Sequence, residues 1–205
     1  MKIKYLVLGV LILAVVVIGI TWSKNGIKQI ASQEGQIILP LPDTSGGKPL
    51  MQALAERRTN RSFSDQTVSM QDLSNILWAA WGINRDDGKR TAPTAMNRQQ
   101  IEVYAVLESG VWRYDAKTNS LQAALAVDAR AKYGNAPLTL LYAAPKGAQY
   151  GEMHIGSLYQ NVGLYCASAG MANVVKASGV DALKDELNLP DKYAVMIVQL
   201  IGWPK

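Results

Sequence analysis

Three short apolar runs in the second half of the chain constrain its fold most strongly. They cover residues 137–143, 172–175 and 194–201, and they contain no charged side chain. Runs of this length and composition are typical of buried strands. Between the first two, apolar side chains recur at helical spacing over residues 155–169, and the pattern stops at Gly170, a residue typical of the position after a helix. The chain therefore predicts a central sheet with a helix packed against it.

Two further helices are predicted in the first half of the chain. Ser69 and Asp72 resemble a capping box in which Asp replaces the usual Glu, and an apolar stripe at helical spacing then continues to Gly82. Pro49 suits the first turn of an earlier helix, whose apolar face leads to Arg57. This earlier helix would deliver a group of arginines at its carboxyl end.

A β-hairpin connects these helices to the apolar runs. Residues 101–107 alternate between apolar and other side chains, and residues 111–114 follow after a turn with Gly110. Helices and strands interleave without regular strand–helix–strand units, so we expect an α+β fold with a central, mostly antiparallel sheet flanked by helices. At 205 residues and 49% apolar content, the chain can fill one ordinary core and is too short for two full domains.

The net charge of +5 is concentrated outside the expected domain. Residues 1–35 contain four lysines and one glutamate, a balance of +3, which leaves +2 of the +5 for all the rest. A protein that binds nucleic acid needs a dense basic face to displace counterions. The nearly neutral body therefore argues against a nucleic-acid partner.

Cysteine and histidine are each present once, as Cys166 and His154. A single cysteine excludes an internal disulfide, and one Cys with one His cannot form a zinc site of the usual spacing. No Ser, Asp or Glu pattern around His154 marks a catalytic triad. We therefore expect no metal, and we name no catalytic acid or base.

The amino terminus is predicted to be a membrane anchor or an export signal. Residues 5–22 carry no charge, with Lys2 and Lys4 before them and Lys24 after them. As a helix this stretch would rise about 27 Å, close to the ~30 Å of a hydrocarbon core. The absence of a small-residue cleavage site favours an uncleaved anchor, and the charges place the body on the extracytoplasmic side. Residues 23–36 would form a tether, and residues 37–205 the folded domain.

The segment after the first helix concentrates positive charge. Arg57, Arg58 and Arg61 surround the hydroxyl of Thr59. Guanidinium groups at this density can form a bidentate phosphate clamp. The alternative is a solvated charge run at a helix end, where cations interact favourably with the last carbonyl groups.

Residues 91–100 form a second unusual segment, Thr-Ala-Pro-Thr-Ala-Met-Asn-Arg-Gln-Gln. It combines small side chains, amides and a proline that fixes the backbone. Such a segment suits contact with a flat heterocycle and hydrogen bonding to its edge. Together with the arginines, it indicates a flavin site.

These two segments, in this order and followed by a strand, resemble the nitroreductase family of FMN-dependent oxidoreductases. Further matches favour the SagB/ThcOx-type branch of that family, and the resemblance runs from about residue 37 to the end of the chain. The additional matching segments are residues 39–42, 46–50, 73–82, 89–94 and 101–104.

The resemblance implies a role for individual residues. Arg57 and Thr59 match the family's phosphate-binding Arg and Ser, with Arg58 beside them, and Arg61 matches the basic residue near flavin N1 and O2. In the second segment, Asn97 matches the residue that bonds the pyrimidine edge. The other residues implied in that segment are Pro93, Thr94, Ala95 and Gln99.

Three further parts of the implied flavin site lie in the second half of the chain. Gln160 belongs to a Gln-Asn pair similar to that of the family. The resemblance implies that it binds the flavin or contacts the other subunit, and an ordinary structural role stays open as the alternative. Lys205 stands where relatives place a basic pair that reaches the phosphate. The loop expected against flavin N5 and O4 consists of Lys176, Ala177, Ser178 and Gly179. In this family the flavin lies at a subunit interface, so a homodimer is expected.

The activity implied by the resemblance is two-step hydride transfer through flavin N5 to or from a small flat substrate, such as a nitroaromatic or a quinone. NAD(P)H is the expected electron donor, although an exported domain would need another reductant, such as a quinone or a redox protein. Two alternatives stay open. One is SagB-type oxidation of azoline rings in peptides, and the other is a membrane-tethered flavin-binding module without turnover.

Overall fold

The computed structural model describes residues 35–205. The predicted hydrophobic helix over residues 5–22 lies outside the described residues. Among the helices between residue 35 and the carboxyl terminus, none is long and apolar enough to cross a membrane. Gln36, expected at the end of the tether, is the first residue of a strand and pairs with Gln122.

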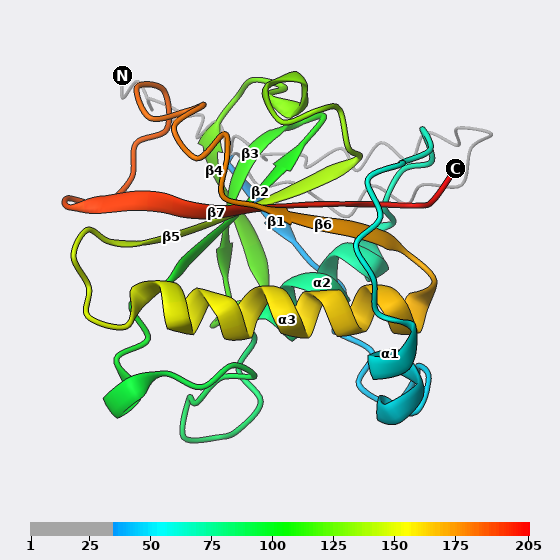
Figure 1. The fold of residues 1–205 in the computed structure, drawn as a ribbon. Coiled ribbons are helices and arrows are strands. Elements are labelled where there is room, and N and C mark those ends of the chain that lie inside the picture. Colours follow the sequence, from blue (N-terminus) through cyan, green and yellow to red (C-terminus); the bar gives the residue numbers. More distant parts are fainter. Residues whose placement is uncertain (1–34) are drawn as a thin grey trace, which may run out of the picture.

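A seven-stranded sheet forms the centre of the described domain, in the order β1-β4-β3-β2-β5-β7-β6 (Figure 1). Every neighbouring pair of strands runs antiparallel, as expected. The strands are β1 (Gln36–Ile38), β2 (Glu102–Leu107), β3 (Gly110–Asp115), β4 (Ser120–Leu125), β5 (Leu138–Pro145), β6 (Ala172–Lys176) and β7 (Tyr193–Gly202).

The three predicted helices are confirmed. They are α1 (Leu50–Glu56), α2 (Met70–Trp81) and α3 (Gly151–Ala169), and two 3-10 turns are present at η1 (Ala95–Asn97) and η2 (Arg130–Lys132). Ser69 caps α2, because its hydroxyl accepts a hydrogen bond from the Asp72 backbone N–H at 3.0 Å. Gly170 ends α3 in the left-handed conformation at φ 74°, which lets the Met171 N–H donate to the Cys166 carbonyl at 2.8 Å.

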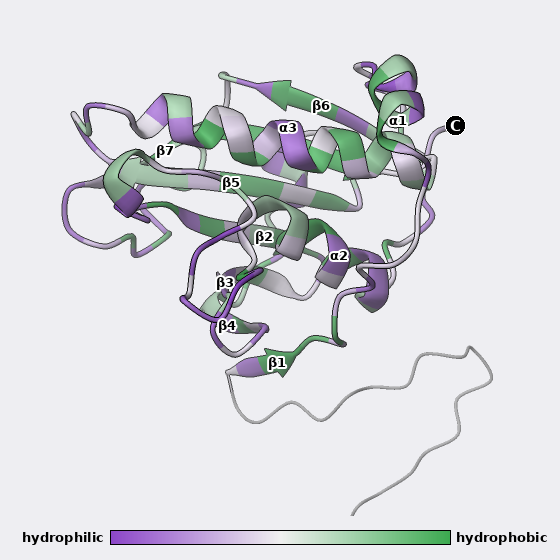
Figure 2. Cartoon of the chain, turned by 90° about the horizontal axis from the view of Figure 1, so that it is seen from below, coloured by the Kyte–Doolittle hydropathy of each residue, from purple (hydrophilic) through white to green (hydrophobic). Residues whose placement is uncertain are grey.

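All three helices cover one face of the sheet (Figures 1 and 2). The sheet separates two hydrophobic cores, and successive side chains of β5 point alternately into one core and the other. Leu140 and Tyr142 pack with the helices, whereas Leu141 and Ala143 point to the opposite face. No α-helix among residues 35–205 covers that second face; the short turn η2 and irregular segments contribute Tyr133, Leu183 and Leu187 to its core.

Two strands and this second cover were not predicted. β1 has only three residues, and the sequence of β4, Ser-Leu-Gln-Ala-Ala-Leu, contains no β-branched side chain. Both strands are therefore specified by the register of their partners rather than by local propensity. The residues that cover the second face are spread over irregular segments and leave no periodic pattern.

Candidate functional site

The start of α1 is fastened to the end of α3. The Lys48 backbone N–H donates to the Ser168 hydroxyl at 2.7 Å, and Lys48 Nζ donates to Glu56 Oε2 at 2.6 Å and to the Ala167 carbonyl at 3.2 Å. Gly47 passes close to Ser168 at φ 102°, where a Cβ atom would lie 2.6 Å from the hydroxyl oxygen. These hydrogen bonds of Lys48 fix the position of α1 and of the arginines that follow it.

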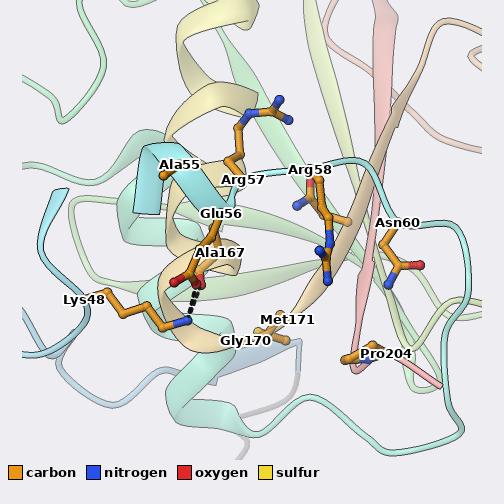
Figure 3. A pocket seen from close by; sticks show the side chains of 11 residues that line it. Lys48, Ala55, Glu56, Arg57, Arg58, Asn60, Ala167, Gly170, Met171 and Pro204 are labelled. Atoms are coloured by element: carbon orange, nitrogen blue, oxygen red, sulfur yellow. Dashed lines mark hydrogen bonds and ion pairs between the residues drawn. The ribbon is translucent and has the colours of Figure 1, made fainter. Parts of the chain in front are cut away.

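A cavity of about 470 Å³ opens where α1 ends (Figure 3). Its wall combines the end of α1, the last turn of α3, the beginning of β6 and the carboxyl-terminal Pro204. In the figure, Arg58 lies between Arg57 and Asn60, and Lys48 reaches Glu56 on the other side. The lining residues are Lys48, Ala55, Glu56, Arg57, Arg58, Asn60, Ala167, Gly170, Met171, Asn173 and Pro204.

The cavity carries uncompensated positive charge. Hydrogen bonds from Lys48 and then from Gln52 hold the pKa of the Glu56 carboxyl below its usual value, so Glu56 is an anion that compensates Lys48. Arg57 and Arg58 form no ion pair with any residue from 35 to 205. Both arginines line the cavity, and Figure 3 shows their guanidinium groups pointing in different directions, so a shared anionic ligand requires one of these exposed side chains to turn toward the other.

The arginine segment is exposed from Arg57 to Thr59 and is joined to the sheet at Asn60. A Cβ atom at Gly163 of α3 would lie 3.7 Å from Arg57 Cδ, an ordinary contact distance, so the arginine stem passes alongside the helix at this point. The Asn60 backbone N–H donates to the Asn173 carbonyl of β6 at 2.9 Å. Thr59 and Arg61 are exposed on this same segment outside the cavity wall, and Lys205 follows the lining residue Pro204.

The second predicted segment forms a strained loop. Met96, Asn97 and Gln99 adopt positive φ values of 54°, 52° and 47°, although none of them is glycine. Side chains other than glycine adopt this region at a cost, and such strain often accompanies a functional site. The Ala95 backbone N–H donates to His154 Nε2 at 2.8 Å, which ties the loop to the first turn of α3.

Gln99 holds this loop together. Its Oε1 accepts from Arg90 Nε at 2.8 Å, and its Nε2 donates to the Gly88 carbonyl and to Asn97 Oδ1. The Arg90 guanidinium lies 4.6 Å from the centre of the Trp81 ring and donates to the Trp81 carbonyl. The sequence interpretation missed Arg90 and His154 as supports of the loop, because both act through contacts with residues distant in the sequence.

The structure does not bring the two predicted segments together within one chain. The 93–99 loop is fastened to His154 at the amino end of α3, whereas Ala167 and Gly170 at its other end line the cavity (Figure 1). The helix from His154 to Ala167 spans about 20 Å at about 1.5 Å per residue. Gln160 lies between them, exposed, on α3.

The predicted N5 loop lies at the far end of β6. Lys176 is the last residue of the strand and is half-buried, while Ala177, Ser178 and Gly179 are exposed. A Cβ atom at Gly179 would lie 3.8 Å from the Tyr133 ring, so the loop rests on the second core. Its exposed backbone can approach a ligand.

The single cysteine, Cys166, is not a reactive nucleophile. Cys166 is fully buried in the core between α3 and the sheet, and burial raises the pKa of its thiol to about 12. A thiol in that state does not ionise near neutral pH. Among residues 35–205, no group of His, Cys, Asp and Glu could hold a metal ion.

We expect His154 to make the stability of the fold depend on pH. Burial lowers the pKa of His154, and the positive charge of Arg98 lowers it further. The neighbouring ring is that of Tyr150. The unfolded chain therefore binds the proton first as the pH falls, and the free energy of unfolding should decrease below the unfolded pKa of about 6.5. Protonated Nε2 also cannot accept from Ala95.

Denaturation in urea between pH 8 and pH 5 measures this effect. His154→Gln is the matched control, since an amide oxygen can accept the Ala95 N–H without titrating in this range. The wild-type chain should lose more stability than this variant. NMR titration of the single histidine gives the pKa directly, and a value at or above 6.5 would contradict the expectation.

Taken together, the fold and the site define an α+β domain with a basic cavity for an anionic ligand. The model of the family described as "Nitroreductase family" matches residues 54–203, well over half of the chain. The chain belongs to the nitroreductase family and is an oxidoreductase.

Individual relatives agree with this assignment. A protein from Methanocaldococcus jannaschii, provisionally named a nitroreductase, is 28% identical over 78% of this chain and 93% of the relative. A crystal structure from Ralstonia eutropha, named in the same provisional way, has a TM-score of 0.77 and 33% identity over 86% of this chain and 92% of that one.

A nitroreductase structure from Bacteroides fragilis contains bound FMN. It has a TM-score of 0.56 and 16% identity, and it covers 77% of this chain and 89% of that one. At this identity the likeness concerns the fold. The family itself is typically FMN-dependent.

Proposed function

We propose that the chain binds FMN and carries out two-step hydride transfer between a donor and a small flat acceptor. The observation that carries the proposal is the cavity at the end of α1, which is lined by Arg57 and Arg58, two arginines that form no ion pair within residues 35–205. The residues present fit a phosphate-bearing cofactor. Glu56 compensates the charge of Lys48, so the charges of Arg57 and Arg58 remain available for a phosphate. Bound FMN would supply the centre that accepts and donates the hydride.

The chain's own residues would bind and orient this cofactor. Arg57, Arg58 and Thr59 would bind the phosphate, with Lys205 close by. Arg61 would stabilise negative charge on the reduced pyrimidine ring, an electrostatic effect that increases when water is excluded. The exposed backbone after Lys176 would contact the flavin edge.

We infer that the active form is a homodimer. The 93–99 loop and the basic cavity lie at opposite ends of α3, so a second copy could bring its own loop, with Asn97, to this chain's cofactor. Exposed apolar side chains accompany both regions: Leu50, Met51 and Leu54 on α1, and Met96 and Met153 beside the loop. Burying such side chains favours association.

The electron donor and the substrate follow from the proposed location. If residues 5–22 anchor the chain with its body on the extracytoplasmic side, NAD(P)H would be scarce there. A quinone or a redox protein would then replace it as the reductant. The proposed acceptor is a flat molecule of the nitroaromatic or quinone type, which could stack against the flavin.

The absorbance spectrum of the purified full chain tests the proposal. We expect visible flavin absorbance and release of about one FMN per chain on denaturation, followed by bleaching under anaerobic conditions with a suitable donor. Failure to retain or take up FMN would overturn the proposal. Bound FMN without turnover for any donor and acceptor tested would favour the alternative of a tethered binding module.

A further inference from the structure

A buried chain of polar side chains leads from the core to the basic cavity. Tyr142 Oη donates to Gln199 Oε1 at 2.6 Å, and both residues are fully buried. Gln199 Nε2 then donates to the Tyr159 carbonyl at 3.3 Å and to Asn173 Oδ1 at 3.2 Å. Asn173 is only 6% exposed and lines the cavity. We refer to Tyr142, Gln199 and Asn173 as the amide relay.

The direction of the amide relay is determined by a backbone carbonyl. Oxygen and nitrogen of an amide side chain are usually assigned from the hydrogen bonds they make. The Tyr159 carbonyl can only accept, so the Gln199 atom that faces it must be the NH₂ group. The Asn173 atom that faces this NH₂ group must then be its oxygen.

The Asn173 NH₂ group is therefore left for the cavity. It forms no hydrogen bond with any other described residue, although its oxygen is engaged and the side chain is more than nine-tenths buried. The nitrogen does not belong to the buried atoms that lack a partner within residues 35–205, which are Ser64 Oγ, Tyr133 Oη and Thr139 Oγ1, so it is accessible from the cavity and can donate to a ligand there. Arg57 Cδ and Asn173 Oδ1 lie 3.7 Å and 3.8 Å from the position that a Cβ atom would occupy at Gly163, so both side chains line the cavity at the same point of α3.

We propose that Asn173 is a ligand-binding residue whose Nδ2 donates a hydrogen bond to a phosphate oxygen of the ligand held by Arg57 and Arg58. A fully ionised phosphate only accepts hydrogen bonds, so a donor fixed by the relay favours it over a ligand group that can only donate, such as an ammonium group. The identification of this phosphate as that of FMN rests on the proposed function.

Binding of FMN, riboflavin and inorganic phosphate to the full chain tests the role of Asn173. Riboflavin lacks only the phosphate, so damage to the fold would weaken both flavins equally. Asn173→Asp keeps the shape and the acceptor for Gln199 but turns an oxygen toward the cavity. We expect this variant to weaken FMN binding by roughly 10- to 100-fold, with riboflavin changed by less than about twofold.

Two further variants separate the donor from the charge. Asn173→Ala removes the donor without adding charge and should weaken FMN binding by roughly tenfold. Asn135→Asp makes the same charge change at an exposed turn outside the cavity and should leave both flavins unaffected. Unchanged FMN affinity in both Asn173 variants, or equal losses for FMN and riboflavin, would overturn the assignment.

Failure of the proposed function gives a different result. A wild-type chain that binds inorganic phosphate but no flavin would contradict the FMN proposal, and the phosphate affinities of the same variants would then decide the role of Asn173. A wild-type chain that binds neither phosphate nor FMN would overturn both.

Discussion

Replacing Arg57 by alanine is expected to weaken FMN binding by roughly 100-fold. Arg57 follows α1 directly, its stem packs over Gly163, and its charge is not compensated by any ion pair within residues 35–205. A guanidinium–phosphate contact can be bidentate and charge-assisted, which makes it one of the stronger polar interactions in proteins. Equilibrium titration of the full chain with FMN, followed by flavin fluorescence, measures the loss.

Two other variants give this experiment its controls. Arg57→Lys retains the charge but not the planar fork, so it should bind FMN with intermediate affinity. Lys117→Ala removes one positive charge at an exposed turn far from the cavity wall and should leave the affinity unchanged. Wild-type affinity in Arg57→Ala, with the fold intact, would contradict the phosphate-clamp assignment.

The sequence could predict those elements whose signal is local. The apolar runs of β5 and β7 are internal strands of the sheet, and each places side chains in both cores. The stripe of α3 and the cap at Ser69 depend on side chains within one helix. The clustering of the arginines could also be predicted, because Arg57 and Arg58 directly follow a helix that ends at Glu56 and stay close together in any fold.

Other parts of the site depend on contacts between residues that are distant in sequence. No pattern in the sequence assigns a role to His154, yet its Nε2 accepts a hydrogen bond from the Ala95 N–H, 59 residues earlier in the chain. Gln199 and Asn173 lie in neighbouring strands, and only the register of β6 with β7 brings their amides together. The positive φ values of Met96 and Asn97 leave no trace in composition, since neither residue is glycine.

The core beneath α3 should respond most strongly to truncation. Leu158 is fully buried on the helix face that packs against the sheet. Leu158→Ala removes its side chain and leaves a cavity, so we expect the free energy of unfolding to fall by about 2–5 kcal/mol. Domains of this kind are stable by only about 5–15 kcal/mol, which makes this a large part of the total. Urea denaturation monitored by tryptophan fluorescence measures the change.

Leu41→Ala is the matched control, because it makes the same change at a side chain that is 83% exposed and lies outside the proposed subunit interface. Its effect should stay within about 0.5 kcal/mol, as is usual for surface positions. An equal loss in both variants would contradict the expectation that burial beneath α3 sets the size of the effect. Added FMN should raise the urea midpoint of Leu158→Ala, since a ligand that binds only the folded state stabilises it. A midpoint that FMN leaves unchanged, in a variant still folded without urea, would mean that the cofactor site depends on the packing of α3.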